Sequence, residues 1–269
     1  MPTLELLDQL VEQVQSSAKY RLITSEVIRN IGARELAKRA SLKEAVKTTR
    51  NKLHQVGSAY QEQGIPYARW MEELQALSDN LADESVRAWL LEQLPAHAST
   101  RERVSILPHF YSTVLASLPP VRSVLDLACG LNPLTLPWMD LPGGCTYTAV
   151  DIYEDLRSFL DVFLFKFHIP GRSICADLTQ TLPPIQADLT LLLKTIPSLE
   201  QVDKQAGARL LAQITSPYLL VSFPAHSLGG KSKGMVQNYE QHFMELTITY
   251  PWKITRFEFP GELAFLVQK

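Results

Sequence analysis

The stretch Val124-Leu125-Asp126-Leu127-Ala128-Cys129-Gly130-Leu131-Asn132-Pro133 decides the fold of this chain. Its first four residues are largely apolar and predict a short buried strand. The small residues at 128–130 follow this strand, so nothing bulky blocks the approach of a ligand to the backbone. Open α/β sheets bind their ligands here, beyond the carboxyl ends of the strands. We therefore expect an α/β sheet with a ligand site at the end of this strand.

A second strand is predicted over 147–151, and it ends on Asp151, 25 residues after Asp126. A carboxylate at this point suits the two hydroxyl groups of a ribose. The pyrophosphate motif G-x-G-x-x-G is missing, because only Gly130 is present. These observations favour a nucleoside cofactor without a pyrophosphate, and S-adenosylmethionine is the candidate. The alternative is two core strands that happen to end in Asp.

The composition is ordinary for a globular protein, with 269 residues, 46% hydrophobic residues, 20% charged residues and a net charge of −2. The length fits one large domain or two small ones. No apolar run approaches the roughly 20 residues that span a bilayer, and the acidic amino terminus differs from a signal peptide. Three cysteines and six histidines lack metal-ligand spacing. We expect no metal, reduced thiols and a cytoplasmic location.

Positive charge gathers in the first part of the chain. Between Lys19 and Lys52, ten basic residues stand against three acidic ones, a local charge of +7, whereas residues 61–97 carry −5. Apolar residues at helical spacing predict helices here. A phosphate backbone selects such a basic patch; the alternative is solvated helix faces. We predict a helical RNA-binding domain over 1–96, with these candidate contacts: Arg34, Lys38, Arg39 and Lys43.

From residue 121 onward, strands and helices alternate, as in a mainly parallel sheet. The predicted helices lie near 153–168 and 203–215. A hairpin over Trp252–Phe259 and Glu262–Val267 would close the sheet with an antiparallel edge, as in a class I Rossmann-like methyltransferase. This second domain spans 97–269. Its parallel strands are predicted at 123–127, 147–151, 172–176, 188–194 and 218–223.

Residues 97–103 precede a predicted helix through Phe110, which Ser99 or Thr100 would cap. Arg103 would then lie in its first turn, where the helix dipole disfavours a cation unless an anion is near. The carboxylate of the methionine moiety could be that anion, and ordinary cap chemistry is the alternative.

Three further features lie at the predicted carboxyl edge. Asp177 could accept the adenine amino group or be a turn residue, and Lys194 could face the target or solvent. The glycine-rich segment 222–235 carries Lys231 and Lys233, which suit phosphate contacts, although a surface loop without function is the alternative. Its spacing is not that of an ATP-binding Walker loop.

Four motifs together resemble the aminoglycoside-resistance 16S rRNA methyltransferases of the Arm/Rmt type. They are HASTRER at 97–103, DLACGLNP at 126–133, KTIPSLE at 194–200 and SFPAHSLGGKSKGM at 222–235. Residues 52–60 also look like the amino-terminal domain of that family, so the resemblance covers nearly the whole chain.

The resemblance implies methyl transfer from S-adenosylmethionine to N7 of guanine 1405 in the A site of the assembled 30S subunit, resistance to aminoglycosides and a monomer. It implies no general base, with positioning by Lys194, Ser222, Phe223 and Pro224. Gln205 is carried over, with Gln201 as its alternative, because the chain is longer than the family pattern at 201–205. The implied cofactor residues are Tyr60, His97, Ala98, Ser99, Arg103, Asp126, Ala128, Gly130, Asp151, Asp177, Leu178, Leu193 and Gln205.

Two other functions compete with an rRNA methyltransferase. A small-molecule methyltransferase would not need the +7 helical region or the lysine-glycine segment. A catalytically silent ribosome-binding protein would not need Asp126, Gly130, Asp151 and Arg103 intact.

Overall fold

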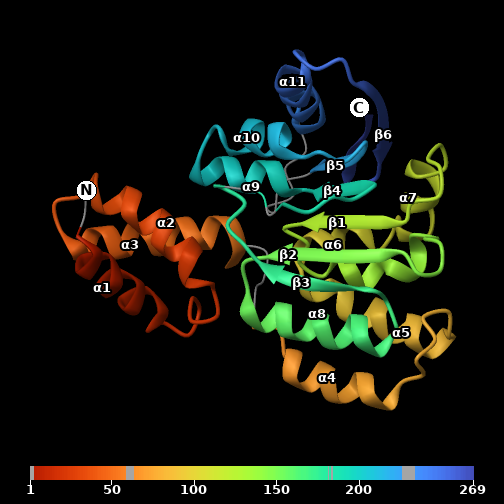
Figure 1. The fold of residues 1–269 in the computed structure, drawn as a ribbon, viewed down its shortest axis with the longest axis horizontal. Helices are drawn as coiled ribbons and strands as arrows, with labels where there is room; N and C mark the ends of the chain where they lie inside the picture. The colour runs from red at the N-terminus through yellow and green to blue at the C-terminus, as the bar shows by residue number, and fades with distance from the viewer. Residues whose placement is uncertain (1–2, 59–63, 181, 183, 226–233) are drawn as a thin grey trace.

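A seven-stranded sheet forms the centre of the computed structural model, which describes residues 3–58, 64–180, 182, 184–225 and 234–269 (Figure 1). The strand order is β3-β2-β1-β4-β5-β7-β6; the pairs β5–β7 and β6–β7 are antiparallel, and the other four pairs are parallel. The mainly parallel sheet with an antiparallel edge is therefore confirmed. The strands are β1 (Ser123–Leu127), β2 (Thr146–Asp151), β3 (Gly171–Cys175), β4 (Leu189–Leu193), β5 (Tyr218–Pro224), β6 (Lys253–Phe259) and β7 (Glu262–Gln268).

Side chains that alternate along each strand enter two cores, one on each face of the sheet. Val124 and Leu191 belong to the first core, whereas Leu125 and Leu192 belong to the second. Both faces of the parallel strands are apolar because helices cover both. The first face is covered by α8 (Glu154–Lys166), α6 (Ala98–Arg103) and α7 (Leu107–Val114), and the second by α9 (Thr195–Val202), α10 (Ala206–Gln213) and α11 (Met235–Thr247).

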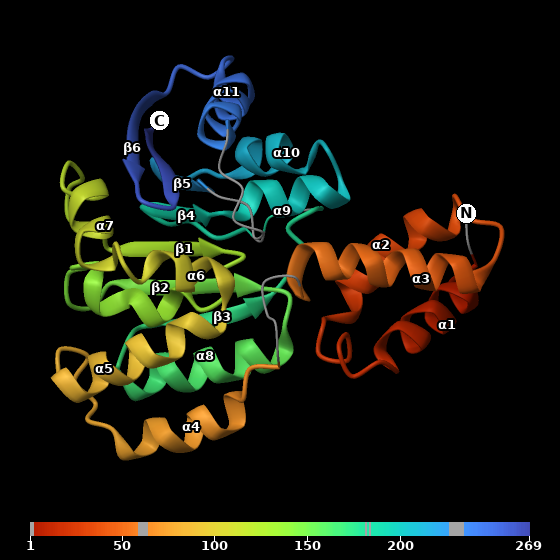
Figure 2. The same cartoon turned by 180° about the vertical axis from the view of Figure 1, so that it is seen from behind.

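Three amino-terminal helices stand beyond the carboxyl ends of β1 and β2, whose arrowheads point toward them (Figures 1 and 2). Ser41 caps the third helix by accepting a hydrogen bond from the Glu44 amide at 3.3 Å. Gly32 lets the first two helices approach, since a Cβ there would lie 2.4 Å from Leu10. We call residues 3–58 the helical unit: α1 (Leu4–Gln15), α2 (Ser25–Leu36), α3 (Leu42–Leu53) and the π-helical turn η1 (His54–Ser58).

The packing divides the first hundred residues differently from the predicted boundary at residue 96. The helix α4 (Tyr67–Ala76) lies beside α8, and Trp89 of α5 (Glu84–Gln93) contacts Trp70 of α4; in Figure 1 both helices lie on the sheet side of the molecule, away from α1–α3. Tyr67 stacks on Phe159 of α8 at 5.2 Å, and Trp70 meets the same ring edge-on at 5.6 Å. Because these aromatic side chains are buried against α8, the acidic segment belongs to the sheet half of the molecule.

The segment after His97 also differs from its prediction. It forms the short helix α6, and Arg103 is its last residue, so Arg103 does not lie in the first turn of the helix through Phe110. That helix is α7, and Thr100 caps neither helix; its hydroxyl donates to the carbonyl of Leu94. The helices α9 and α11 were not predicted, nor were the 3-10 turns η2 (Leu94–Ala96) and η3 (Asn132–Trp138). Among the described helices, none has the length and apolar character to cross a membrane.

Candidate functional site

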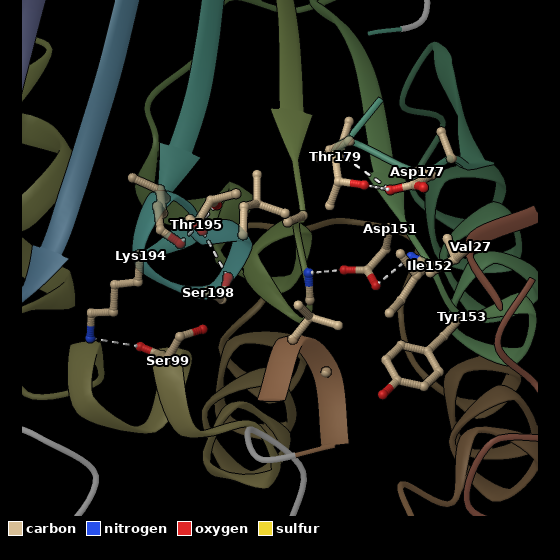
Figure 3. A pocket seen from close by; sticks show the side chains of 18 of the residues that line it. Val27, Ser99, Asp151, Ile152, Tyr153, Asp177, Thr179, Lys194, Thr195 and Ser198 are labelled. Atoms are coloured by element: carbon tan, nitrogen blue, oxygen red, sulfur yellow. Dashed lines mark hydrogen bonds between the residues drawn. The ribbon is translucent and has the colours of Figure 1, made fainter. Parts of the chain in front are cut away.

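A cavity lies at the carboxyl edge of the sheet, where open α/β sheets bind their ligands (Figure 3). The turns after β1, β2 and β4 and the segment after β3 form its floor, and α2 and η1 of the helical unit form the facing wall. The predicted residues that line it are His97, Ser99, Ala128, Gly130, Asp151, Asp177, Leu178, Leu193 and Lys194.

The turn after β1 is built from left-handed backbone. Ala128 has φ of 52° and Gly130 has φ of 50°, a region that glycine adopts more readily than other residues. A Cβ on Gly130 would also lie 3.0 Å from the imidazole of His97. The amide of Gly130 donates to Oδ2 of Asp151 at 2.8 Å. The small residues thus let the turn and the end of β2 meet at the cavity.

The carboxylate of Asp151 is fixed by backbone. Besides the bond from Gly130, its Oδ1 accepts from the amide of Ile152 at 2.7 Å. Burial raises the pKa of Asp151, although these two amides favour its charged form. Each carboxylate oxygen has a second lone pair, so the group can accept further hydrogen bonds from a ligand.

Asp177 is held in a turn after β3. Its Oδ1 accepts from the amide and the hydroxyl of Thr179, at 2.9 and 2.7 Å. Its Oδ2 accepts from the side-chain amide of Asn30 on α2 at 2.9 Å. Figure 3 shows Asp177 and Thr179 on the same side of the cavity as Asp151, with Val27 of α2 nearby. This side of the cavity therefore offers the carboxylates of Asp151 and Asp177 as hydrogen-bond acceptors, next to the apolar side chain of Val27.

The opposite side of the cavity carries Lys194, which is 5% exposed and has left-handed φ of 59°. Its ammonium donates to Glu102 at 2.6 Å and to the carbonyl of Ser99 at 3.4 Å. The hydroxyl of Ser99 lies 3.0 Å from Nδ1 of His97. Burial, together with the charges of Lys194 and Arg103, lowers the pKa of His97 to about 4. The imidazole is therefore neutral at pH 7.

Arg103 does not line the cavity. It is 1% exposed, and its guanidinium binds Glu262 of β7 through Nη2 at 2.6 Å and Nε at 3.1 Å. Its Nη1 donates to Asn132 at 2.9 Å. The charge of Glu262 raises the pKa of Arg103 against the effect of burial. The anion that a cation requires here is thus a protein carboxylate, which the sequence prediction did not anticipate.

Asp126 also lies outside the cavity lining. Its Oδ2 accepts from the hydroxyl of Tyr147 at 2.6 Å and from the amide of Asn132 at 2.9 Å. The carboxylate of Asp126 therefore holds Asn132, which follows the turn after β1, and does not face a ligand.

The ionisation of Asp126 should make stability depend on pH. Burial raises its pKa from 3.8 to about 6, so the folded chain holds this proton more tightly than the unfolded chain. Ionisation of Asp126 therefore lowers the free energy of unfolding. This loss of stability is absent below about pH 4 and complete above about pH 6, where it reaches about 3 kcal/mol. Urea unfolding at pH 4 and pH 7 should show Asp126→Asn gaining about this much over the wild type at the higher pH. An equal difference at both pH values would contradict the assignment.

Several predicted residues lie away from the cavity. Gln201 and Gln205 are both exposed, and Gln205 precedes the first residue of α10. Phe223 is buried in the second core, stacked on Tyr239 at 5.1 Å. Ala98, Ser222 and Pro224 do not line the cavity either. Tyr60, Lys231 and Lys233 fall outside the described residues.

The helical unit adds cavity residues that the sequence analysis missed. Val27 and Ile31 of α2 line the cavity, as do Val56 and Gly57 of η1. Thr195 and Ser198 of α9 also line the cavity and were not predicted. The only available signal was the apolar spacing of α2, and that spacing is the same for an ordinary core face.

The predicted RNA contacts differ in how free their charges are. Arg34 binds Asp203 at 3.2 Å and Arg39 binds Glu35 at 3.4 Å. Lys38 and Lys43 are exposed, and Lys47 on α3 is exposed beside them. Arg34 thus joins the helical unit to the sheet half, whereas the lysines are available to a polyanion.

This sheet order, with β7 inserted between β5 and β6 and a cavity bounded by the ends of β1, β2 and β4, defines a class I methyltransferase. No cluster of three or more histidine, cysteine or acidic side chains in the described ranges could hold a metal ion.

Comparison with known proteins narrows the class. The family described as "Ribosomal RNA methyltransferase (FmrO)" matches residues 16–266, so the chain belongs to that family. Relatives named 16S rRNA (guanine(1405)-N(7))-methyltransferase include one from Micromonospora echinospora, 36% identical over 98% of this chain and 97% of the relative. Another, from Frankia casuarinae, is 37% identical over 98% and 94%.

Solved structures agree with this assignment. The 16S rRNA methyltransferase RmtF in complex with S-adenosyl-L-homocysteine superposes with a TM-score of 0.81, at 28% identity over 100% of both chains. The 16S rRNA methylase RmtB superposes with a TM-score of 0.77, at 27% identity over 98% of both chains. The Arm/Rmt resemblance of the sequence motifs is therefore confirmed.

Proposed function

We propose that this chain transfers a methyl group from S-adenosylmethionine to N7 of guanine 1405 of 16S rRNA. It acts as a monomer in the cytoplasm on the assembled 30S subunit and confers aminoglycoside resistance. The observation that carries the proposal is one cavity whose floor holds the carboxylates of Asp151 and Asp177 and whose wall is the basic helical unit. The names of the full-length relatives support the choice of base.

The cavity suits an adenosyl ligand. The carboxylate of Asp151, held by the backbone amide of Gly130, would accept hydrogen bonds from ribose hydroxyls, and Oδ2 of Asp177 would accept one from the amino group of the base. Leu178 and Ile31 offer apolar surface to the faces of the base. Ser99, His97 and Lys194 border the far end, where the methionine moiety would lie.

The reaction asks for positioning more than for acid–base chemistry. S-adenosylmethionine, when bound, supplies an electrophilic methyl group on a sulfonium centre. Guanine N7 has a free lone pair, so no proton must be removed before it attacks. Alignment of the reacting atoms can contribute roughly 7–11 kcal/mol. The chain's residues therefore bind, orient and exclude water, and none serves as a general base.

Methylation at N7 explains resistance in chemical terms. It removes one of the major-groove acceptors of guanine and adds a positive charge to the base. A cationic aminoglycoside that binds at this base loses a hydrogen bond and meets electrostatic repulsion.

Incubation with methyl-labelled S-adenosylmethionine tests the proposal. Isolated 30S subunits should take up one methyl group per particle, and mapping should place it at guanine 1405, whereas free 16S rRNA should remain unlabelled. Labelling at another base, or of small molecules only, would contradict the proposed substrate.

The exposed lysines of the helical unit should bind rRNA phosphates. Changing Lys38, Lys43 and Lys47 together to Glu removes up to three phosphate contacts and adds repulsion, so 30S binding should fall by roughly 100-fold or more at physiological salt. Affinity for S-adenosylhomocysteine should stay within twofold by calorimetry, because none of the three lines the cavity. If the affinities for 30S and for S-adenosylhomocysteine fell equally, the proposal that these lysines bind rRNA and not the cofactor would be contradicted.

Lys253→Glu provides the matched control, since it reverses an exposed lysine on β6 at the far edge of the sheet. Arg34, although predicted to contact RNA, is unsuitable for this experiment. Arg34→Glu would break the ion pair with Asp203, so its loss of activity would not report RNA binding alone.

A further inference from the structure

One face of α2 is turned toward the cavity. Asn30 and Ile31 follow Val27 by three and four residues, so both lie near Val27 on the helix surface. Val27 and Ile31 are each 2% exposed and line the cavity. Asn30, half-buried between them, reaches the carboxylate of Asp177 with a hydrogen bond of 2.9 Å. The helix α2, which belongs to the basic helical unit together with α3, is therefore also part of the cavity wall.

The carboxylate of Asp177 receives its orientation from two sources. Thr179, in the same turn, occupies Oδ1 with two hydrogen bonds. Asn30 holds Oδ2 from across the cavity boundary. A carboxylate oxygen has two lone pairs, so Oδ2 can accept from Asn30 and from a ligand together. Without Asn30, the two hydrogen bonds from Thr179 to Oδ1 are the remaining described contacts that orient the carboxylate, and Oδ2 is held less firmly toward the ligand's amino group.

The start of α2 is attached beside Asp151 in the same way. Ile23 forms a β-bridge with Tyr153. On either side of it, the amide of Thr24 donates to the carbonyl of Ile152 at 3.0 Å, and the amide of Glu154 donates to the carbonyl of Leu22 at 2.8 Å. The helical unit is thus joined to the sheet at both carboxylates of the cavity. A ligand between the two parts contacts both and favours their joined arrangement.

We infer that Asn30 is a positioning residue of the cofactor site and that, through α2, cofactor binding and 30S binding strengthen each other. The inference rests on the proposed function, which supplies the cofactor and the 30S ligand. By linkage, each ligand must raise the affinity for the other by the same factor. We expect a factor of about five or more, the usual lower range for coupled sites.

Two measurements on the full chain test this inference. Calorimetry with S-adenosylhomocysteine should show Asn30→Ala binding about tenfold more weakly than wild type, the effect of one hydrogen bond to a charged group. Asn30→Gln, which keeps the amide donor, should recover part of the loss. In methylation assays the KM for S-adenosylmethionine should rise while kcat at saturation is kept. Asn51→Ala, an exposed asparagine on α3, is the matched control and should bind as wild type.

The second measurement is 30S affinity with and without saturating S-adenosylhomocysteine. Wild type and Asn51→Ala should bind 30S about fivefold more tightly with the ligand, and Asn30→Ala should lose this difference. If the wild type binds 30S equally tightly with and without S-adenosylhomocysteine, the inference is overturned. This measurement uses the wild type alone, so it does not depend on whether a variant folds. Unchanged ligand binding by Asn30→Ala also overturns it while the proposed function stands. Failure of the wild type to bind S-adenosylhomocysteine would overturn both.

Discussion

Asp151→Ala should weaken the binding of S-adenosylhomocysteine by about 100-fold or more. The carboxylate would accept both ribose hydroxyls, and hydrogen bonds to a charged group contribute about 1.5–3 kcal/mol each. The substitution also removes the acceptor of the Gly130 and Ile152 amides, so the turn after β1 loses its link to β2. Titration calorimetry measures the affinity, and thermal unfolding shows whether the variant is folded.

Asp155→Asn is the matched control. Asp155 lies four residues further on, in the first turn of α8, and its carboxylate accepts from the amide of Leu156 and does not line the cavity. The affinity of Asp155→Asn for S-adenosylhomocysteine should stay within twofold of wild type. If folded Asp151→Ala binds the ligand within threefold of wild type, the ribose is not held at this carboxylate.

Glu262→Gln should lower the free energy of unfolding by about 3–5 kcal/mol, the usual cost of removing one partner of a buried ion pair. Glu262 is fully buried, and its carboxylate lies between Arg103 at 2.6 Å and Lys194 at 3.4 Å. In this variant the buried cations Arg103 and Lys194 lose the negative charge of Glu262. Urea unfolding at pH 7 measures the loss.

The pH dependence gives an independent check. Despite burial, Arg103 and Lys194 lower the pKa of Glu262 below its ordinary value of 4.5. Its contribution is therefore complete above about pH 4.5 and is lost as the pH falls through the folded value, so the gap between wild type and variant should narrow in acid. Glu258→Gln, on exposed β6, is the control and should change stability by less than about 1 kcal/mol. An equally small effect at Glu262 would contradict the buried pair.

The alternation of strands and helices made the sheet predictable, because apolar runs that end in Asp or small residues report both the strand and its carboxyl end. The residues on those ends, Gly130, Asp151 and Asp177, could be placed at the cavity for the same reason. Arg103 could not, because its partner Glu262 is 159 residues away. The wall formed by Val27 and Ile31 was also hidden, since docking of α2 depends on tertiary contacts. Likewise, α4 packs on α8 through aromatic side chains whose partners the sequence does not reveal.

The insertion of β7 between β5 and β6 has a consequence for biosynthesis. This strand leaves the ribosome after both of its neighbours, fills an interior position of the sheet and brings with it Glu262, the carboxylate that binds Arg103. Until then, β5 presents an unpaired edge, which is prone to association with other chains. Nascent chains should therefore remain protease-sensitive until β7 has emerged, and ribosome-bound intermediates stalled before residue 262 should depend on chaperones.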